Sequence, residues 1–190
     1  MPQEPLVDAR IVTFSDAAFN ICSSTSYGQS GFVSGILYRT RSGDERTFHA
    51  LDWGSTKQRR VTHSSYGAEI VACCDADDHG LNLKHALRSV FSEHDFAHVL
   101  IVDSKGLFDT ITTLHDGREY RLRQTVQRIR DSFESQDINV MRWVQGPANV
   151  ADALTKRSTH SHRLLNRIVS TGKLLLPQHR SFELDSEHWV

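Results

Sequence analysis

The chain has 190 residues, with 22 Lys and Arg against 23 Asp and Glu, and its formal net charge is −1 at pH 7. Hydrophobic residues make up 38% and charged residues 24%, which is typical of one folded domain and excludes a disordered chain. The near-neutral charge excludes binding of nucleic acid through bulk charge alone, and leaves local basic patches open.

No apolar run is long enough to cross a bilayer, and residues 1–5 lack the basic and apolar segments of a signal peptide. Three cysteines, of which Cys73 and Cys74 are adjacent, give neither a disulfide framework nor a zinc spacing. We therefore expect buried or idle thiols in an intracellular protein, cytoplasmic or nuclear, that is not secreted and does not bind a membrane.

The first part of the chain is predicted to form an antiparallel meander. Residues 1–9 form a leader, a first strand ends at Asp16, and a Ser-, Thr- and Gly-rich loop covers 22–30. Alternating residues predict strands over 31–38 and 47–53, joined by a hairpin turn at 41–44.

Helices and strands alternate after the meander. Apolar spacing predicts one long helix over 65–90, a short helix that begins at Ser104, and an amphipathic helix over 122–133 after a break at 116–117. Apolar runs predict strands over 98–103 and 139–144, and a last helical region ends at Gly172. The predicted fold class is therefore α/β, with a five-stranded mixed sheet flanked by helices in one domain over 10–173, followed by a tail over 174–190.

Two of the predicted strands end on a carboxylate, Asp16 and Asp103. Carboxylates at the ends of neighbouring strands repel each other strongly unless a cation lies between them. Glu69 and Asp152 lie in the predicted first turns of helices that can pack against the same edge, where open α/β sheets bind their ligands.

Each acid also has a purely structural explanation. Asp16 can begin a loop, and Asp103 can cap the helix that follows it. Glu69 can complement a helix dipole, and Asp152 can form a capping box with Asn149. Four acids at the ends of elements that face one edge favour a shared site over four separate explanations.

Several local sequences have the residue pattern of a known family. The segments 15–19 (Ser-Asp-Ala-Ala-Phe) and 53–58 (Trp-Gly-Ser-Thr-Lys-Gln) are similar to Ser-Asp-Ala-Asp-Trp and Trp-Ser-Ser-Lys-Lys-Gln in the ribonuclease H domain of copia-type LTR retrotransposon polyproteins. The segment 61–70 resembles its Val-Ala-x-Ser-Ser-x-Glu-Ala-Glu-Tyr, and 151–156 carries its Ala-Asp-x-Leu-Thr-Lys. These matches run in family order over most of the chain.

The resemblance implies a ribonuclease H-like fold and a catalytic, metal-binding set of four acids, matched here by Asp16, Glu69, Asp103 and Asp152. It also implies two divalent ions, Mg²⁺ with Mn²⁺ as an alternative. Mg²⁺ prefers carboxylate and water oxygens, and a pair of such ions activates a water and stabilises the leaving oxygen in phosphodiester hydrolysis. In the family the first-strand aspartate, here Asp16, bridges the ions.

The chain departs from the family pattern at a few positions. Gly67 replaces a glutamate, and Ser104 and Lys105 replace Asn-Gln or Asn-Lys after Asp103. The loop 145–151 has no histidine, and His160 and His162 are expected to be exposed at a helix start.

A hybrid duplex would be held through its phosphates and 2′-hydroxyls. The predicted contacts are Lys57, Arg59, Arg60, Ser104, Lys105 and Lys156, with Arg157 and the arginines from Arg118 to Arg130 as further candidates. The arginines can equally form a solvated helix face. Trp53 and Trp143 are expected to be core or half-buried strand residues.

The sequence thus predicts a metal-dependent endonuclease that cleaves the RNA strand of RNA–DNA hybrids, with an upstream reverse transcriptase domain as its partner. Two alternatives remain: a non-catalytic ribonuclease H-like module that binds nucleic acid or connects domains, and a DNA-cutting nuclease or transposase of the same broad fold. Loss of one acid would mark the first, and a different spacing of fewer acids would mark the second.

Overall fold

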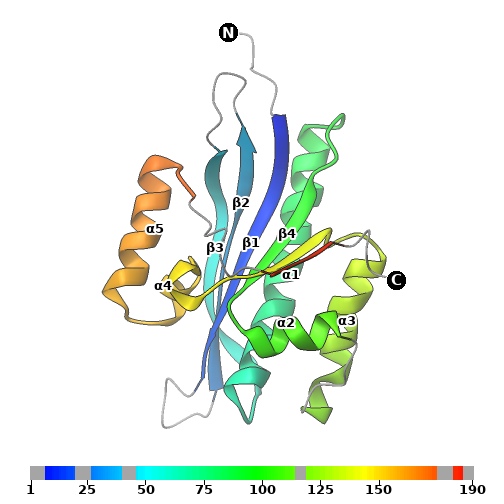
Figure 1. Ribbon diagram of the computed structural model, residues 1–190, viewed down its shortest axis with the longest axis vertical. Coiled ribbons are helices and arrows are strands. Elements are labelled where there is room, and N and C mark those ends of the chain that lie inside the picture. Colours follow the sequence, from blue (N-terminus) through cyan, green and yellow to red (C-terminus); the bar gives the residue numbers. More distant parts are fainter. Residues whose placement is uncertain (1–6, 20–26, 40–45, 114–118, 175–181, 186–190) are drawn as a thin grey trace.

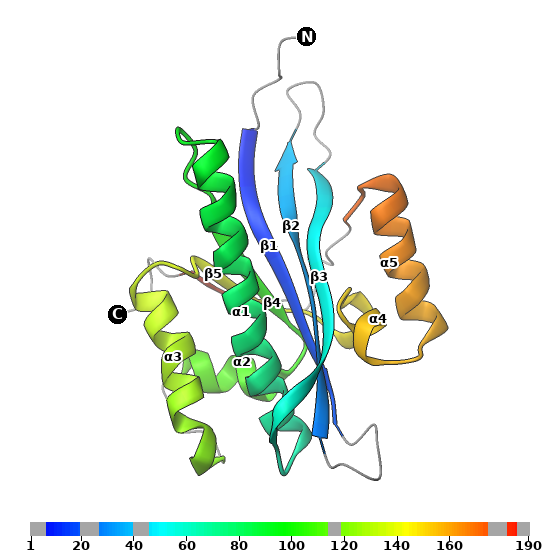
Figure 2. The same cartoon turned by 180° about the vertical axis from the view of Figure 1, so that it is seen from behind.

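The computed structural model describes residues 7–19, 27–39, 46–113, 119–174 and 182–185. A central sheet lies between two layers of helices (Figure 1). Turning the molecule by 180° shows α1 and α3 on one face, while α4 and α5 lie on the other (Figure 2). The predicted hairpin turn, the helix break at 116–117, Arg118 and Cys22 lie outside the described residues.

The sheet has the strand order β3-β2-β1-β4-β5-β6. Its strands are β1 (Val7–Ala18), β2 (Tyr27–Arg39), β3 (Arg46–Val61), β4 (Ala97–Val102), β5 (Val140–Trp143) and β6 (Phe182–Asp185). β1, β2 and β3 pair in antiparallel fashion, whereas β4 runs parallel to β1 and to β5. The meander and the mixed sheet are confirmed, so the carboxyl ends of β1 and β4 meet at one edge.

The strand boundaries differ from the predicted ones in several places. β1 begins at Val7, inside the predicted leader, and continues past Asp16 to Ala18, so Asp16 lies two residues before the end of its strand. β2 begins at Tyr27, inside the predicted loop, and β3 continues to Val61 instead of ending at position 53. In this half of β3 Gln58 is buried between exposed Lys57 and Arg59, so polar residues occupy both faces and conceal the alternation. β6 is an additional edge strand that pairs antiparallel with β5 and was not predicted.

The helices follow the predicted pattern closely. They are α1 (Ser65–Val90), α2 (Lys105–Thr112), α3 (Arg123–Glu134), α4 (Asp152–Thr155) and α5 (Thr159–Thr171), with 3₁₀ turns η1 (Tyr120–Leu122) and η2 (Gly146–Ala148). Gly172 ends α5 in the left-handed conformation with φ 67°, as predicted. Ser64 caps α1 by accepting a hydrogen bond from the Gly67 amide, and this cap places Glu69 beyond the first turn. The prediction that Glu69 lies in the first turn is therefore wrong.

Apolar side chains fill both sides of the sheet. On one face Ile70 of α1, Leu107 of α2 and Ile129 of α3 pack with Leu100 of β4. On the other face Ile168 of α5 packs with a cluster that includes Phe14 of β1. Both helix layers are thereby fixed to the sheet, and the site at its edge has a rigid support.

Cys73 and Cys74 are buried free thiols within α1. None of the helices in the described segments combines the length and apolar character that a membrane span requires.

Candidate metal centre

Asp16, Glu69 and Asp103 converge at the edge where β1 and β4 end. One carboxylate oxygen from each residue lies within 4.8 Å of the other two. Phe14 of β1 lies opposite Ile101 of the parallel strand β4, so Asp16 and Asp103, two residues further on, reach the same level. The structure thus brings together three of the four predicted acids.

Glu69 reaches the two aspartates from the helix layer. α1 packs against β1 and β2, and the Glu69 carboxylate accepts a hydrogen bond from the backbone of Ala17, the residue after Asp16. This contact aims the side chain at the strand ends.

The three carboxyl groups disfavour one another's ionised forms. Burial, followed by the charges of Asp103 and Asp16, raises the pKa of Glu69 to about 9. Burial and then the charge of Asp16 raise the pKa of Asp103 to about 6. Burial also raises the pKa of Asp16. A divalent cation among these oxygens would remove that penalty, and an all-oxygen donor set suits a hard ion such as Mg²⁺.

Asp152, the fourth predicted acid, is buried at the start of α4 but has other partners. One of its carboxylate oxygens contacts the Lys156 ammonium, and the other accepts a hydrogen bond from Ser161. Lys156 also pairs with Asp16, at 3.3 Å between Nζ and Oδ1. Asp152 is therefore linked to the three-acid cluster through Lys156.

The structure contradicts the purely structural explanations given for Glu69, Asp103 and Asp152. Glu69 lies beyond the first turn of α1, and Ser104, rather than Asp103, caps α2 by accepting a hydrogen bond from Leu107 N (3.4 Å). The predicted capping box is absent from α4, whose first residue Asp152 follows Ala151 without a side-chain cap.

Asn149 instead joins three parts of the site. The side-chain Nδ2 of Asn149 donates to the backbone carbonyl of Ser15 at 2.8 Å, and the side chain also hydrogen-bonds Asp103. The side-chain Oδ1 accepts a hydrogen bond from the backbone amide of Ala151 at 3.1 Å. Sequence reasoning assigned no such role to Asn149, nor to Thr155, whose hydroxyl donates to Asp16 Oδ2; only their position beside Asp152 in the motif pointed to them.

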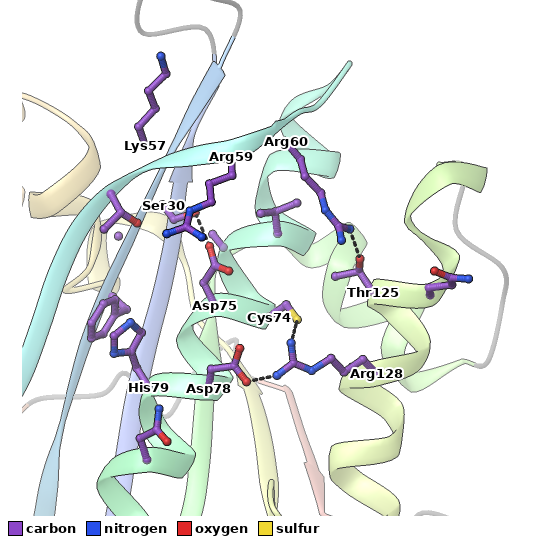
Figure 3. Close-up of a pocket in the computed structure, with 17 residues that line it drawn as sticks. Ser30, Lys57, Arg59, Arg60, Cys74, Asp75, Asp78, His79, Thr125 and Arg128 are labelled. Carbon is purple, nitrogen blue, oxygen red and sulfur yellow. Dashed lines mark hydrogen bonds and ion pairs between the residues drawn. The ribbon is translucent and has the colours of Figure 1, made fainter.

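Three predicted substrate contacts, Lys57, Arg59 and Arg60 of β3, line a groove of about 590 Å³ between β2, β3, α1 and α3. Figure 3 shows Arg59, Arg60 and Arg128 extending into it from β3 and α3. Arg60 donates to Thr125 (3.3 Å), and Arg128 pairs with Asp78. Arg59, Arg60 and Arg128 against Asp75 and Asp78 leave this groove with an excess of positive charge. The side chain of Lys57 points away from the groove, and its ammonium lies 4.3 Å from the centre of the Tyr27 ring.

The other predicted contacts are engaged within the protein. Ser104 caps α2, and Lys105 pairs with Asp109 at 2.8 Å. The arginines of α3 do not form a uniformly solvated face, since Arg130 is buried and donates to the Thr110 carbonyl at 2.7 Å.

Aromatic and histidine residues near the site follow the predictions only in part. Trp143 is half-buried and donates to the Asp103 carbonyl at 2.8 Å, as expected of a strand residue. Trp53 is 62% exposed, so its prediction as core or half-buried is wrong. It lies on β3, which is an edge strand of the sheet. His160 and His162 are exposed in the first turn of α5, as expected.

No protein-family model matches the sequence, and no curated protein is significantly similar to it. Among solved structures, LC11-RNase H1, isolated from compost by a metagenomic approach, is similar with a TM-score of 0.51 and 18% identity over 76% of this chain and 91% of that one. The structure of LC11-RNase H1 in complex with an RNA/DNA hybrid is similar with a TM-score of 0.50 and 14% identity, over 76% of this chain and 93% of that one. The N-terminal RNase H domain of a Mycobacterium tuberculosis protein is similar with a TM-score of 0.50 and 14% identity, over 86% of this chain and 98% of that one. The chain therefore has a ribonuclease H fold.

Proposed function

We propose that this protein is a metal-dependent endonuclease that hydrolyses the RNA strand of RNA–DNA hybrids. One observation carries the proposal: Asp16, Glu69 and Asp103 present carboxylate oxygens within 4.8 Å of one another at the carboxyl end of the parallel strands. In open α/β sheets ligands bind beyond the carboxyl ends of the strands, which is where these acids lie.

Asp16, Glu69 and Asp103 would hold a first Mg²⁺, and Asp16 with Asp152 a second; Mn²⁺ has the same ligand preferences. When bound, two such ions supply a nucleophilic water near neutral pH and stabilise the leaving 3′ oxygen. The protein's own part is to fix the acids in place. Thr155 and Asn149 do so by hydrogen bonds to Asp16 and Asp103.

The hybrid would be held through its backbone by Lys57, Arg59 and Arg60 in the basic groove, with Ser104, Lys105 and Lys156 as contacts beside the acids. Phosphate contacts need positive charge and no base reading, which suits a nuclease without sequence preference. The solved complex of LC11-RNase H1 with an RNA/DNA hybrid supports this class of substrate.

The biological setting we propose is reverse transcription of a copia-type retrotransposon, inside the cell and together with a reverse transcriptase domain. The support for it is the local resemblance described above, above all the segment 151–156.

Purified protein should be incubated with a labelled RNA–DNA hybrid, duplex DNA and duplex RNA, each with Mg²⁺ or with chelator. We expect cleavage of the hybrid alone, abolished by chelator and by Asp103→Asn. Asp95→Asn is the matched control, because Asp95 is 77% exposed and pairs with Arg88, which is not a proposed substrate contact. That variant should cut the hybrid at the wild-type rate.

The outcomes separate the alternatives. Cleavage of duplex DNA would favour a DNA-cutting nuclease or transposase. Binding of the hybrid without cleavage would favour a non-catalytic module.

A further inference from the structure

Lys156 occupies an unusual position for a lysine at the end of a helix. It directly follows α4, and its ammonium lies between two acids, 3.3 Å from Asp16 Oδ1 and in contact with Asp152 Oδ1. Its side chain is 45% exposed, whereas that of Asp16 is fully buried. The Lys156 side chain therefore reaches from the solvent-exposed surface to the buried carboxylate of Asp16.

Asp16 consequently faces two cation positions. The first lies among Asp16, Glu69 and Asp103. The second lies between Asp16 and Asp152, where Lys156 supplies the positive charge. Ser161 and Thr155 bind the remaining oxygens of Asp152 and Asp16, so both carboxylates are held in this arrangement.

A lysine ammonium is ordinarily charged at neutral pH, and that of Lys156 lies between two carboxylates. An ammonium and a divalent cation cannot share the same carboxylate oxygens without strong mutual repulsion.

We propose that Lys156 is a built-in occupant of the second cation position, so that one divalent ion binds freely and a second binds only by displacing this ammonium from Asp16 and Asp152. Lys156 is a positioning residue in this scheme, since it acts through the acids. The protein would bind its two ions in sequence with clearly different affinities.

The test is a titration of the metal-free full chain with Mn²⁺, followed by calorimetry and by the electron paramagnetic resonance signal of free Mn²⁺. Wild type should show one tight and one weak site. Lys156→Met should tighten the weak site about tenfold, because two carboxylates lose their internal partner, and change the tight site less than about twofold.

Two control variants accompany this titration. Lys156→Arg keeps the positive charge and should retain the weak second site. Lys105→Met removes another i,i+4 lysine–aspartate pair, that with Asp109, and should leave both sites unchanged. An unchanged weak site in folded Lys156→Met would overturn the proposal.

A measurement on the wild type covers the case in which Lys156→Met does not fold. The ¹⁵N resonance of the Lys156 ammonium should shift only as the second equivalent of Mg²⁺ binds. A shift with the first equivalent, or none at saturation, would overturn the proposal equally.

This inference rests on the proposed cation site but not on hybrid cleavage, so the two can fail separately. Hybrid cleavage by a protein whose metal affinities are unchanged in Lys156→Met would contradict the role of Lys156 and leave the nuclease proposal intact. Lys156-dependent binding of two ions by a protein that cuts no hybrid would remove only the nuclease proposal.

Discussion

The side-chain amide of Asn149 donates a hydrogen bond to the carbonyl oxygen of Ser15, at 2.8 Å, and so fastens the segment before α4 to the end of β1. Asn149 is 1% exposed, which means that no water replaces a lost partner. Asn149→Ala should lower the free energy of unfolding by about 1–3 kcal/mol. Urea unfolding in chelator measures this loss, and Mn²⁺ titration should show weaker binding because Asp103 loses a hydrogen bond.

Asn166 of α5 offers a matched control, since its side chain is exposed. Asn166→Ala should stay within about 0.5 kcal/mol of wild type. Equal stability of Asn149→Ala and wild type would mean that Asn149 does not join β1 to α4 in solution.

Gly31 of β2 lies opposite Asp16 and leaves room for α4. A Cβ atom at this position would lie 2.6 Å from Thr155 Cγ2 and 3.2 Å from the Ala151 carbonyl. Gly31→Ala should therefore push α4 outward, cost about 1–3 kcal/mol of stability and weaken cation binding. Gly106→Ala in α2 meets only ordinary contacts at 3.6 Å, and should stabilise the protein by about 0.5–1 kcal/mol. Intact stability and Mn²⁺ affinity in Gly31→Ala would argue against close packing of α4 on β2.

Cation binding should release protons. The pKa of Glu69 is raised to about 9, so this group is protonated at pH 7.5 in the cation-free protein and must ionise to bind a metal. Calorimetry at pH 7.5 in two buffers of different ionisation enthalpy should give about one proton released per first ion bound. Glu69→Gln should fold, bind the ion more weakly and release far fewer protons. Binding without proton release in wild type would show that Glu69 is already ionised.

The same shifts set the sign of a stability change. A carboxyl pKa raised by folding gives stability that is fully present below the unfolded value and is lost as the pH rises through the folded one. For Asp103 and Glu69 the losses come as the pH rises through about 6 and about 9. Added Mg²⁺ should therefore raise the free energy of unfolding of the metal-free protein more at pH 8.5 than at pH 6.

His98 of β4 should act in the opposite direction. It is fully buried, its Nε2 lies 3.0 Å from Thr13 Oγ1, and burial lowers its pKa to about 4. A lowered histidine pKa gives stability that is present above about 6.5, the ordinary value, and lost as the pH falls toward 4. Wild type should therefore lose stability relative to His98→Gln by at most about 1.4 kcal/mol per pH unit in this window.

Unfolding of both proteins in chelated solution at pH 7, 6 and 5 measures that difference, because the carboxyl contributions cancel between them. A constant difference across the three values would mean that His98 does not remain neutral in the fold.

The sequence predicted a cluster of four acids, and for the three that the structure brings together the information is local. Asp16 lies two residues before the end of β1, Asp103 directly follows β4, and parallel strands bring their carboxyl ends to one edge. Glu69 was found by its helix, although the turn was misplaced because the cap is Ser64. A strand or helix pattern predicts which element carries a residue and the approximate position of the residue along that element.

The partners of these acids could not be predicted in the same way. Lys156 and Asp16 are 140 positions apart, and their contact depends on how α4 packs on the sheet. The pairing of β6 with β5 and the exposure of Trp53 likewise depend on how distant parts of the chain pack together. Local patterns do not contain that information.

The central claim is that Asp16, Glu69 and Asp103 jointly hold a divalent cation, and crystals grown with Mn²⁺ test it most directly. Anomalous diffraction should give a peak about 2.0–2.3 Å from an oxygen of each of the three carboxylates. A fully occupied peak elsewhere, with these carboxylates turned apart at saturating Mn²⁺, would contradict the account.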